Sequence, residues 1–220
     1  MKKQIVIVGT GAVAAEITSN IEDTPFGEIA GIEIKGYLEY SQNIDAYYKK
    51  YGFTKPVIGD LDTYQPAADD YFVLGVANIG FRRKVIATLE SRHAQFITLI
   101  NHTAMVARTA KIGRGNVINP MCMIGPNVEL GDFNILTSGS ILSHDCKVGD
   151  NNAFSTALLC GHVTVGNDNT FGIRGTVVPH VTIGNRNMIQ AGMIVDKDVA
   201  DDSTVFHRFK EKVIAIPKSE

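Results

Sequence analysis

The fold is decided by residues 112–148, which read IGRGNVINPMCMIGPNVELGDFNILTSGSILSHDCKV. Every sixth residue of this stretch is aliphatic, and the series continues to the aromatic residue Phe154. The next member, Val165, follows after eleven residues instead of twelve, and the six-residue spacing then resumes as far as Val195. One residue is therefore missing from a repeat near Cys160. The series is Ile112, Ile118, Ile124, Leu130, Leu136, Leu142, Val148, Phe154, Val165, Phe171, Val177, Ile183, Ile189 and Val195.

A six-residue period predicts a coil of short parallel strands. The period is too long for simple strand alternation and does not fit the 3.6-residue turn of an α-helix. Each repeat is then a strand followed by a corner, where the glycines of Ile112-Gly113 and Ile124-Gly125 suit the turn. Three repeats close one triangular coil, so residues 106–195 hold about five coils. A β-sandwich with accidental spacing is the alternative.

The first hundred residues are predicted to form a small Rossmann-like α/β domain. An apolar strand over residues 4–8 leads into the sequence GTGAVA at residues 9–14 and then into a helix that reaches Ile21. A G-x-G-x-x-A turn between strand and helix presents bare backbone N–H groups that can receive phosphate. Further strands are predicted over residues 29–38 and 71–76, and a helix over residues 80–91. A tight turn without a ligand is the alternative explanation of these glycines.

The size of this domain favours a mononucleotide over NAD. About 100 residues precede the coil, too few for the six strands of a full dinucleotide-binding fold. Glu39, at the end of the strand over residues 29–38, could hold a ribose or a base edge. An exposed acidic residue at a strand end is the alternative for this position.

Composition points to small-molecule partners. The 220 residues carry a net charge of -2, with no block of Lys and Arg to hold a nucleic acid or an anionic membrane surface. No apolar run approaches the ~20 residues that span a bilayer. Cys122, Cys146 and Cys160 form no CxxC pair, and their odd number leaves at least one unpaired, which suits a reducing compartment. A cytoplasmic location is predicted.

The sequence Ser143-His144-Asp145-Cys146-Lys147-Val148-Gly149, in a hexapeptide coil behind such a domain, resembles one family. It is similar to bacterial acetyltransferases of the sialic-acid O-acetyltransferase and nucleotide-4-amino-sugar N-acetyltransferase type. Residues 56–61 (PVIGDL) and 75–78 (GVAN) are similar to further family segments. The resemblance implies a left-handed parallel β-helix over residues 101–220 behind a nucleotide-sugar domain over residues 1–100. It also implies acetyl-CoA as co-substrate, no metal, and a homotrimer with active sites between subunits.

The resemblance implies roles for individual residues. His144 matches the general base, Asp145 the acid that raises its basicity, and Gly161 the backbone N–H that stabilises a tetrahedral oxyanion. A neutral imidazole is well suited to accept the proton of an attacking amine near pH 7. Gly161 also matches a residue of the coenzyme site, as do Ile173 and Ala191. The positions that match nucleotide-sugar contacts are Gly9, Gly11, Ala12, Val13, Glu39, Tyr40, Ala77 and Asn78.

The histidines allow more than one interpretation. His144 follows inward Leu142 by two positions, so it is also explained as a structural histidine, and Asp145 can orient it only at a corner or bulge. His162 and His180 should stack on adjacent coils as a possible metal pair. A zinc hydratase would need three converging histidines, and the missing residue breaks the register of His144 with His162.

The substrate and the reaction class are also open at this point. N-acetylation of a nucleotide-linked amino sugar is predicted, with O-acetylation of a sialic acid as the alternative, because a hydroxyl would use the same base as an amine. A protein of a different class, a non-catalytic module that binds nucleotide sugars, would need the first domain but not the base.

Overall fold

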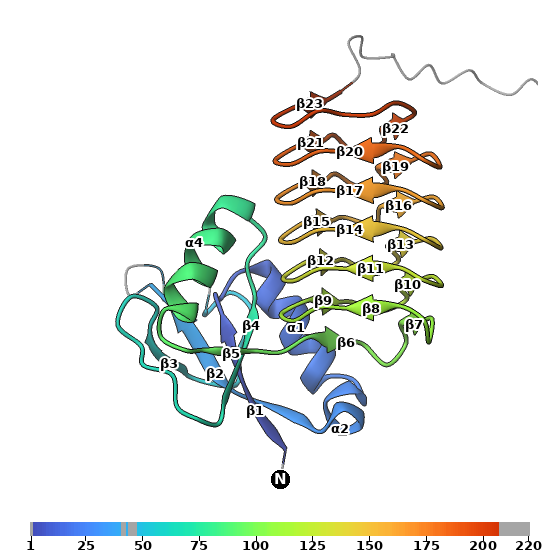
Figure 1. Ribbon diagram of the computed structural model, residues 1–220. Coiled ribbons are helices and arrows are strands. Elements are labelled where there is room, and N and C mark those ends of the chain that lie inside the picture. The colour runs from blue at the N-terminus through green and yellow to red at the C-terminus, as the bar shows by residue number, and fades with distance from the viewer. Residues whose placement is uncertain (1, 41–42, 44–47, 207–220) are drawn as a thin grey trace, which may run out of the picture.

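A computed structural model of the chain describes residues 2–40, 43 and 48–206 (Figure 1). A small α/β domain lies beside a prism of stacked coils. The fold class predicted from the sequence is confirmed, including the left-handed sense of the coil. The end of the predicted second domain, residues 207–220, lies outside the described residues. Among the residues that the structure describes, no helix is long and apolar enough to cross a membrane.

The prism has three faces, each a sheet of two-residue parallel strands. The apolar face contains β7 (Met105–Val106), β10 (Met123–Ile124), β13 (Ile141–Leu142), β16 (Leu158–Leu159), β19 (Thr176–Val177) and β22 (Ile194–Val195). The charged face contains β8 (Lys111–Ile112), β11 (Glu129–Leu130), β14 (Lys147–Val148), β17 (Thr164–Val165) and β20 (Thr182–Ile183). The covered face contains β6 (Leu99–Ile100), β9 (Val117–Ile118), β12 (Ile135–Leu136), β15 (Ala153–Phe154), β18 (Thr170–Phe171), β21 (Met188–Ile189) and β23 (Thr204–Val205).

The core of the prism consists of the predicted inward series. From β9 to β22 the second residue of each strand is buried and stacks on its equivalents in the neighbouring coils, as Phe154 does on Phe171 with ring centroids 4.7 Å apart. The coil extends beyond the predicted residues 106–195 at both ends, from Leu99 to Val205. The missing residue lies before Leu159, because Leu159 follows Phe154 after only five positions.

A ladder of buried asparagines fastens the corner between the charged and covered faces. The amide of Asn134 donates to Gly149 O at 3.0 Å in the next coil, and its carbonyl oxygen accepts from Asn152 N at 2.9 Å. Buried amides need such partners because an unpaired polar group in a core is costly. The ladder consists of Asn116, Asn134, Asn152, Asn169 and Asn187.

The α/β domain is a five-stranded parallel sheet in the order β3-β2-β1-β4-β5. Its predicted strand over residues 29–38 begins only at Ile32, because helix α2 ends at Gly31, whose φ of 64° is the left-handed conformation that favours glycine. The strands are β1 (Lys3–Val8), β2 (Ile32–Glu39), β3 (Val57–Asp60), β4 (Asp70–Leu74) and β5 (Gln95–Phe96). The helices are α1 (Ala12–Glu22), α2 (Phe26–Ala30) and α4 (Ile79–Glu90).

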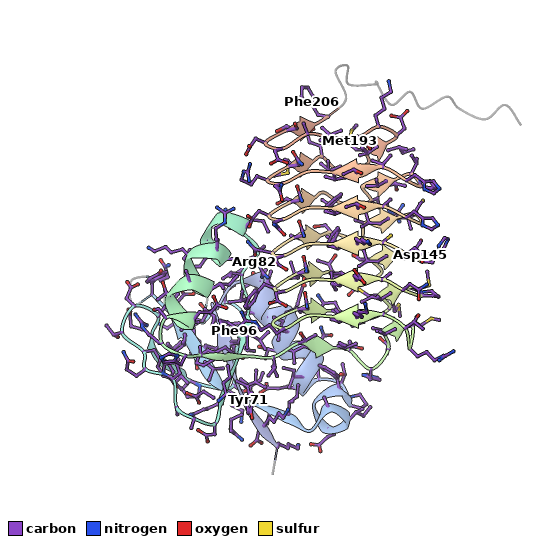
Figure 2. The ribbon with its side chains drawn as sticks, in the orientation of Figure 1. Tyr71, Arg82, Phe96, Asp145, Met193 and Phe206 are labelled. Atoms are coloured by element: carbon purple, nitrogen blue, oxygen red, sulfur yellow. The ribbon has the colours of Figure 1, made fainter. Side chains whose placement is uncertain are left out.

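Arg82 joins the α/β domain to the coil (Figure 2). Its side chain is completely buried, and burial lowers its pKa to about 10. The guanidinium donates to Val76 O at 2.8 Å, to Asn151 Oδ1 at 3.0 Å and to Phe133 O. Val76 belongs to the loop after β4, whereas Asn151 and Phe133 are corner residues of the coil. The cation therefore fixes this loop against the prism through three acceptors.

Replacement of Arg82 should destabilise the chain far more than replacement of its neighbour. Arg82→Met leaves three acceptors, two of them buried, without a donor, and we expect it to lower the free energy of unfolding by about 2–4 kcal/mol. Arg83→Met removes an exposed ion pair with Asp168, so it should cost less than about 1 kcal/mol. Urea unfolding of both variants measures the difference, and equal stabilities would contradict this account of the junction.

Candidate active site

One corner of the prism, at the edge between the apolar and charged faces, brings together His144, His162 and His180. We call it the histidine corner. It contains His144 beside a column of four residues, Asn127, Asp145, His162 and His180, which lie one above another in successive coils. Each has a φ between 59° and 67°, the left-handed conformation that asparagine and aspartate adopt more readily than most residues. The positions just before them are Pro126, His144, Gly161 and Pro179.

The corner brings His144 and Asp145 into contact although they are consecutive residues. His144 Nδ1 lies 2.8 Å from Asp145 Oδ2. An ionised carboxylate only accepts hydrogen bonds, so Nδ1 is the donor and the lone pair of Nε2 is left free. Hydrogen bonds from His144 and from Asn127 hold the pKa of the Asp145 carboxyl below its usual range. The requirement that the pair lie at a corner is met, and the pair can act as an oriented base.

Gly161 lies directly against the His144 imidazole. A Cβ at this position would come within 2.5 Å of His144 Cε1 and 2.7 Å of Nε2, so only glycine leaves the ring in place. The positions equivalent to Gly161 in other coils include Pro126 and Pro179, which have no N–H. Among the described residues, the Gly161 N–H donates to no backbone carbonyl, while Gly161 O accepts from His180 N at 3.2 Å. A donor is thus available beside the base.

Two of the three predicted coenzyme residues lie on a different corner from the third, Gly161. Ile173 and Ala191 are exposed at the edge between the covered and apolar faces, one above the other in successive coils. His144 and Gly161 border the opposite edge of the same apolar face. The structure therefore does not bring these two groups of residues together within one chain.

The predicted nucleotide residues gather at one edge of the α/β sheet. Gly9, with a φ of 101°, follows β1, while Glu39 ends β2 and Ala77 and Asn78 follow β4. Parallel strands present their carboxyl ends together, which is the usual ligand-binding edge of such sheets. Asn78 Oδ1 caps α4 by accepting from Phe81 N at 2.9 Å.

Glu39 is buried rather than exposed, being 9% accessible. Its Oε2 accepts from the backbone N and the Oγ1 of Thr10 at 3.1 and 3.0 Å, and its Oε1 accepts from Tyr40 N at 2.9 Å. The carboxylate therefore holds the glycine turn in shape. Thr10 was not identified from the sequence, and the only signal for it was its place between two glycines.

Helix α1 begins at this edge without a cap of its own. Its N-cap is Gly11, no side chain bonds to the first turn, and that turn has no acidic residue. Ala12 and Val13 are the first residues of the helix, and no atom lies within 4 Å of a Cβ built on Gly11. The open N-terminus can accept an anionic group through backbone N–H donors and the helix dipole.

The remaining histidines follow the predicted stacking. The rings of His162 and His180 are parallel within 6° and lie 4.8 Å apart. The residue that stacks with His162 in the preceding coil is Asp145 and not His144, so the missing residue does break the register between the two histidines. Asp145 itself lies on the side of the prism away from the α/β domain (Figure 2).

No known protein family matches the sequence, and no curated protein matches it. Three solved structures share nearly its whole architecture. The chain has the fold of these proteins. A histidine mutant of GDP-perosamine N-acetyltransferase from Caulobacter crescentus, bound to CoA and GDP-perosamine, is 21% identical with a TM-score of 0.79 over 91% of this chain and 92% of its own.

The other two structures cover the chain equally well. The acetyltransferase domain of PglB from Neisseria gonorrhoeae FA1090 is 21% identical with a TM-score of 0.78, over 92% of this chain and 96% of its own. WeeI from Acinetobacter baumannii AYE is 20% identical with a TM-score of 0.76, over 92% and 96%. At these identities the comparisons confirm the predicted resemblance at the level of the fold.

A methyl group at position 161 should separate the two members of the His–Asp pair. In Gly161→Ala we expect the His144 ring to swing into solvent and the Nδ1–Oδ2 distance to exceed ~3.5 Å, beyond hydrogen-bonding range. Stability should fall by less than about 1 kcal/mol, because the ring is already exposed. A crystal structure measures the distance, with Thr164→Ala as the control. An unchanged pair in Gly161→Ala would show that the corner has more room than its geometry indicates.

Proposed function

We propose that the protein is an acetyl-CoA-dependent N-acetyltransferase that acts on a nucleotide-linked amino sugar of the 4-amino-4,6-dideoxy type, with His144 as general base. The observation that carries the proposal is the His144–Asp145 pair beside the Gly161 N–H. The fold supports it, since a solved structure with this fold is bound to CoA and GDP-perosamine. Synthesis of a surface glycan is the proposed setting.

The proposed reaction transfers acetyl from sulfur to nitrogen. The sugar amine attacks the thioester carbonyl and forms a C–N bond, while His144 Nε2 takes a proton from the nitrogen. The negative charge on the carbonyl oxygen is stabilised by the Gly161 N–H. When the C–S bond breaks, the imidazolium returns its proton to the CoA thiolate. Asp145 stabilises the imidazolium between these steps, and no metal ion is required.

The edge of the α/β domain is the proposed nucleotide-sugar site. The open N-terminus of α1 at Gly11, Ala12 and Val13 would receive the phosphates. Glu39 would act mainly by holding the glycine turn, since Thr10 and Tyr40 already bond to both its oxygens. Tyr40, Ala77 and Asn78 complete the proposed site. Asn78 caps α4, the helix that carries Arg82, and so connects the loop after β4 to that helix.

The apolar face supports the proposed homotrimer. Its outward residues include Met105 and Ile194, which are 68% and 67% exposed, together with Met123, Ile141 and Leu158. The charged face presents Lys111, Glu129 and Lys147 instead. Because His144 and Ile173 border opposite edges of the apolar face, threefold association through it would place the histidine corner of one subunit beside the coenzyme corner of the next.

We also propose a division of the chain into two domains and a cellular location. Residues 1–100 would form the nucleotide-sugar domain and residues 101–220 the acetyltransferase coil. The cytoplasm is the proposed location, which agrees with three free cysteines and with the need for acetyl-CoA.

His144→Ala should fold normally and lose most turnover. General bases contribute about 10²–10⁴-fold to rate, and the His144 side chain is 57% exposed, so its loss should not disturb the core. Release of CoA thiol is followed with UDP-, GDP- and dTDP-linked 4-amino sugars and with free and CMP-linked sialic acid. His102→Ala removes an exposed histidine outside the site and should keep full turnover.

The same substrate panel separates N-acetylation from O-acetylation and from binding without catalysis. Turnover of His144→Ala near the wild-type rate would sink the assignment of the base. Turnover of the wild type only on sialic acid would make the reaction an O-acetylation. No turnover on any substrate, with no binding of CoA by calorimetry, would leave a non-catalytic nucleotide-sugar-binding module.

Charge on the apolar face should dissociate the trimer. We expect the double variant Ile141→Lys, Leu158→Lys to be a monomer in size-exclusion chromatography with light scattering, because it buries two cations at the interface. Turnover should fall with it, since the two halves of the site lie on different subunits. Thr164→Lys with Thr182→Lys makes the matched change on the charged face and should remain trimeric. A monomeric wild type, or a trimeric apolar-face variant, would contradict the proposed interface.

A further inference from the structure

We propose that His144, Asp145 and His162 form a binding site for a divalent transition-metal ion of the Zn²⁺ type, and that this ion reversibly blocks the base. The blocking effect rests on the proposed function. The binding does not, because it depends only on the three side chains.

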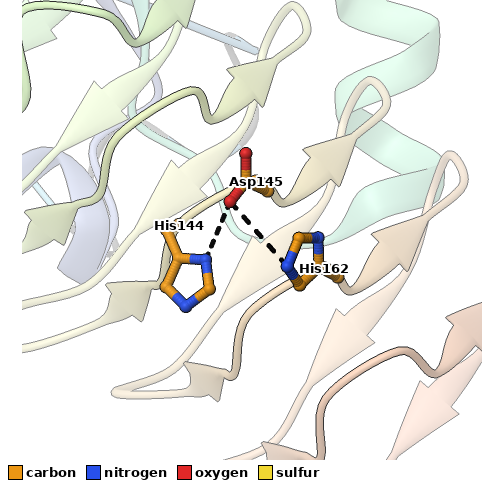
Figure 3. A group of neighbouring side chains, drawn as sticks. All are labelled: His144, Asp145 and His162. Carbon is orange, nitrogen blue, oxygen red and sulfur yellow. Dashed lines mark hydrogen bonds and ion pairs between the residues drawn. The ribbon is translucent and has the colours of Figure 1, made fainter.

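Three metal-ligating atoms converge at the histidine corner (Figure 3). The ligand atoms of His144, Asp145 and His162 all lie within 4.8 Å of one another. His144 Nδ1 and His162 Nε2 approach the same oxygen, Asp145 Oδ2, at 2.8 and 3.9 Å. Small rotations of exposed side chains are enough to replace these contacts by bonds to one ion.

The chemistry of the three ligands selects the kind of ion. Two imidazoles and one carboxylate suit Zn²⁺ and its neighbours among the transition metals, whereas Mg²⁺ and Ca²⁺ prefer all-oxygen sites. The side chains of His144, His162 and Asp145 are 57%, 49% and 37% exposed. An ion can therefore enter from solution, and water can complete a tetrahedral shell.

The angles between the rings place the ion between His144 and His162 rather than between His162 and His180. The lone pair of an imidazole nitrogen lies in the plane of its ring. His162 and His180 are parallel within 6°, so their lone pairs do not converge on one point. His144 and His162 are inclined by 85° with centroids 5.2 Å apart, and their lone pairs can meet.

Neighbouring groups hold the ligands in position. His162 N donates to His144 O at 3.1 Å, which ties the two corners of successive coils together. Asn127 Nδ2 donates to Asp145 Oδ1 at 3.1 Å and so orients the carboxylate. Such surrounding contacts orient metal ligands and usually strengthen binding.

Binding of the ion would remove the base. A metal bound to His144 Nδ1 takes the place of the proton that now bonds to Asp145, and the neutral ring then carries its proton on Nε2. That nitrogen no longer has a free lone pair to accept the proton of a sugar amine. The ion needs no redox change or co-reactant, and a chelator would restore the Nδ1 hydrogen bond.

The test is calorimetric titration of the full-length, EDTA-treated chain with ZnCl₂, backed by the visible spectrum of bound Co²⁺. We expect one ion per chain. His162→Asn and His144→Asn should each weaken binding at least about tenfold, since loss of a surrounding contact alone costs 10–100-fold. His180→Asn, the matched change one coil further on, should keep one ion with affinity within about threefold. MgCl₂ should not compete.

Absence of saturable Zn²⁺ binding would overturn the proposal, as would binding that His162→Asn leaves unchanged. Loss of binding in His180→Asn with retention in His144→Asn would move the ion to the stacked pair and also overturn it. If the wild type turns over a sugar substrate, Zn²⁺ should inhibit it, and His162→Asn should need at least tenfold more Zn²⁺ for the same fractional loss of its own rate. If no substrate turns over, the proposed function fails while the calorimetry still decides the site.

Discussion

The repeated backbone hydrogen bonding of one coil to the next is the constraint on which the rest of the structure depends. Because every coil is held on its neighbour in register, the position of a residue in the repeat decides its face or corner. The five-residue step from Phe154 to Leu159 shows how a change of one residue in the repeat changes the position of the residues that follow. With an unbroken repeat, His162 would lie against His144, whereas the shorter turn brings Gly161 there and leaves room for the imidazole.

The same constraint separates the chemistry of the three faces. The outward side chains of Val117, Ile135 and Ala153 pack into the core of the α/β domain, so that face is satisfied within one chain. The side chains of the charged face are suited to contact with solvent, and some of them form ion pairs, such as Lys111 with Glu129. Only the apolar face has no such partner among the described residues, and the two proposed halves of the active site border it. One apolar surface is thus the basis of both the proposed trimer and the proposed active site.

The periodicity predicted the inward core because a core position in a coil depends only on spacing along the chain. Contacts between distant segments carry no such period. The roles of Arg82 and Thr10 were missed because each is defined by partners that only folding brings near, Phe133 and Asn151 for the first and Glu39 for the second. The spacing placed the missing residue near Cys160, and the structure narrows its position to the turn between Phe154 and Leu159.

The exposure of the His–Asp pair gives a physical argument for the proposed association of three chains. In water, the attraction between an imidazolium and a carboxylate about 3–4 Å apart is only about 1 kcal/mol, and an oxyanion gains as little from one N–H donor. Both interactions grow several-fold where water is excluded. The histidine corner of a single chain is open to solvent, with His144 57% exposed. A neighbouring prism laid along the apolar face would lower the dielectric at this corner while the rigid coil keeps the pair oriented.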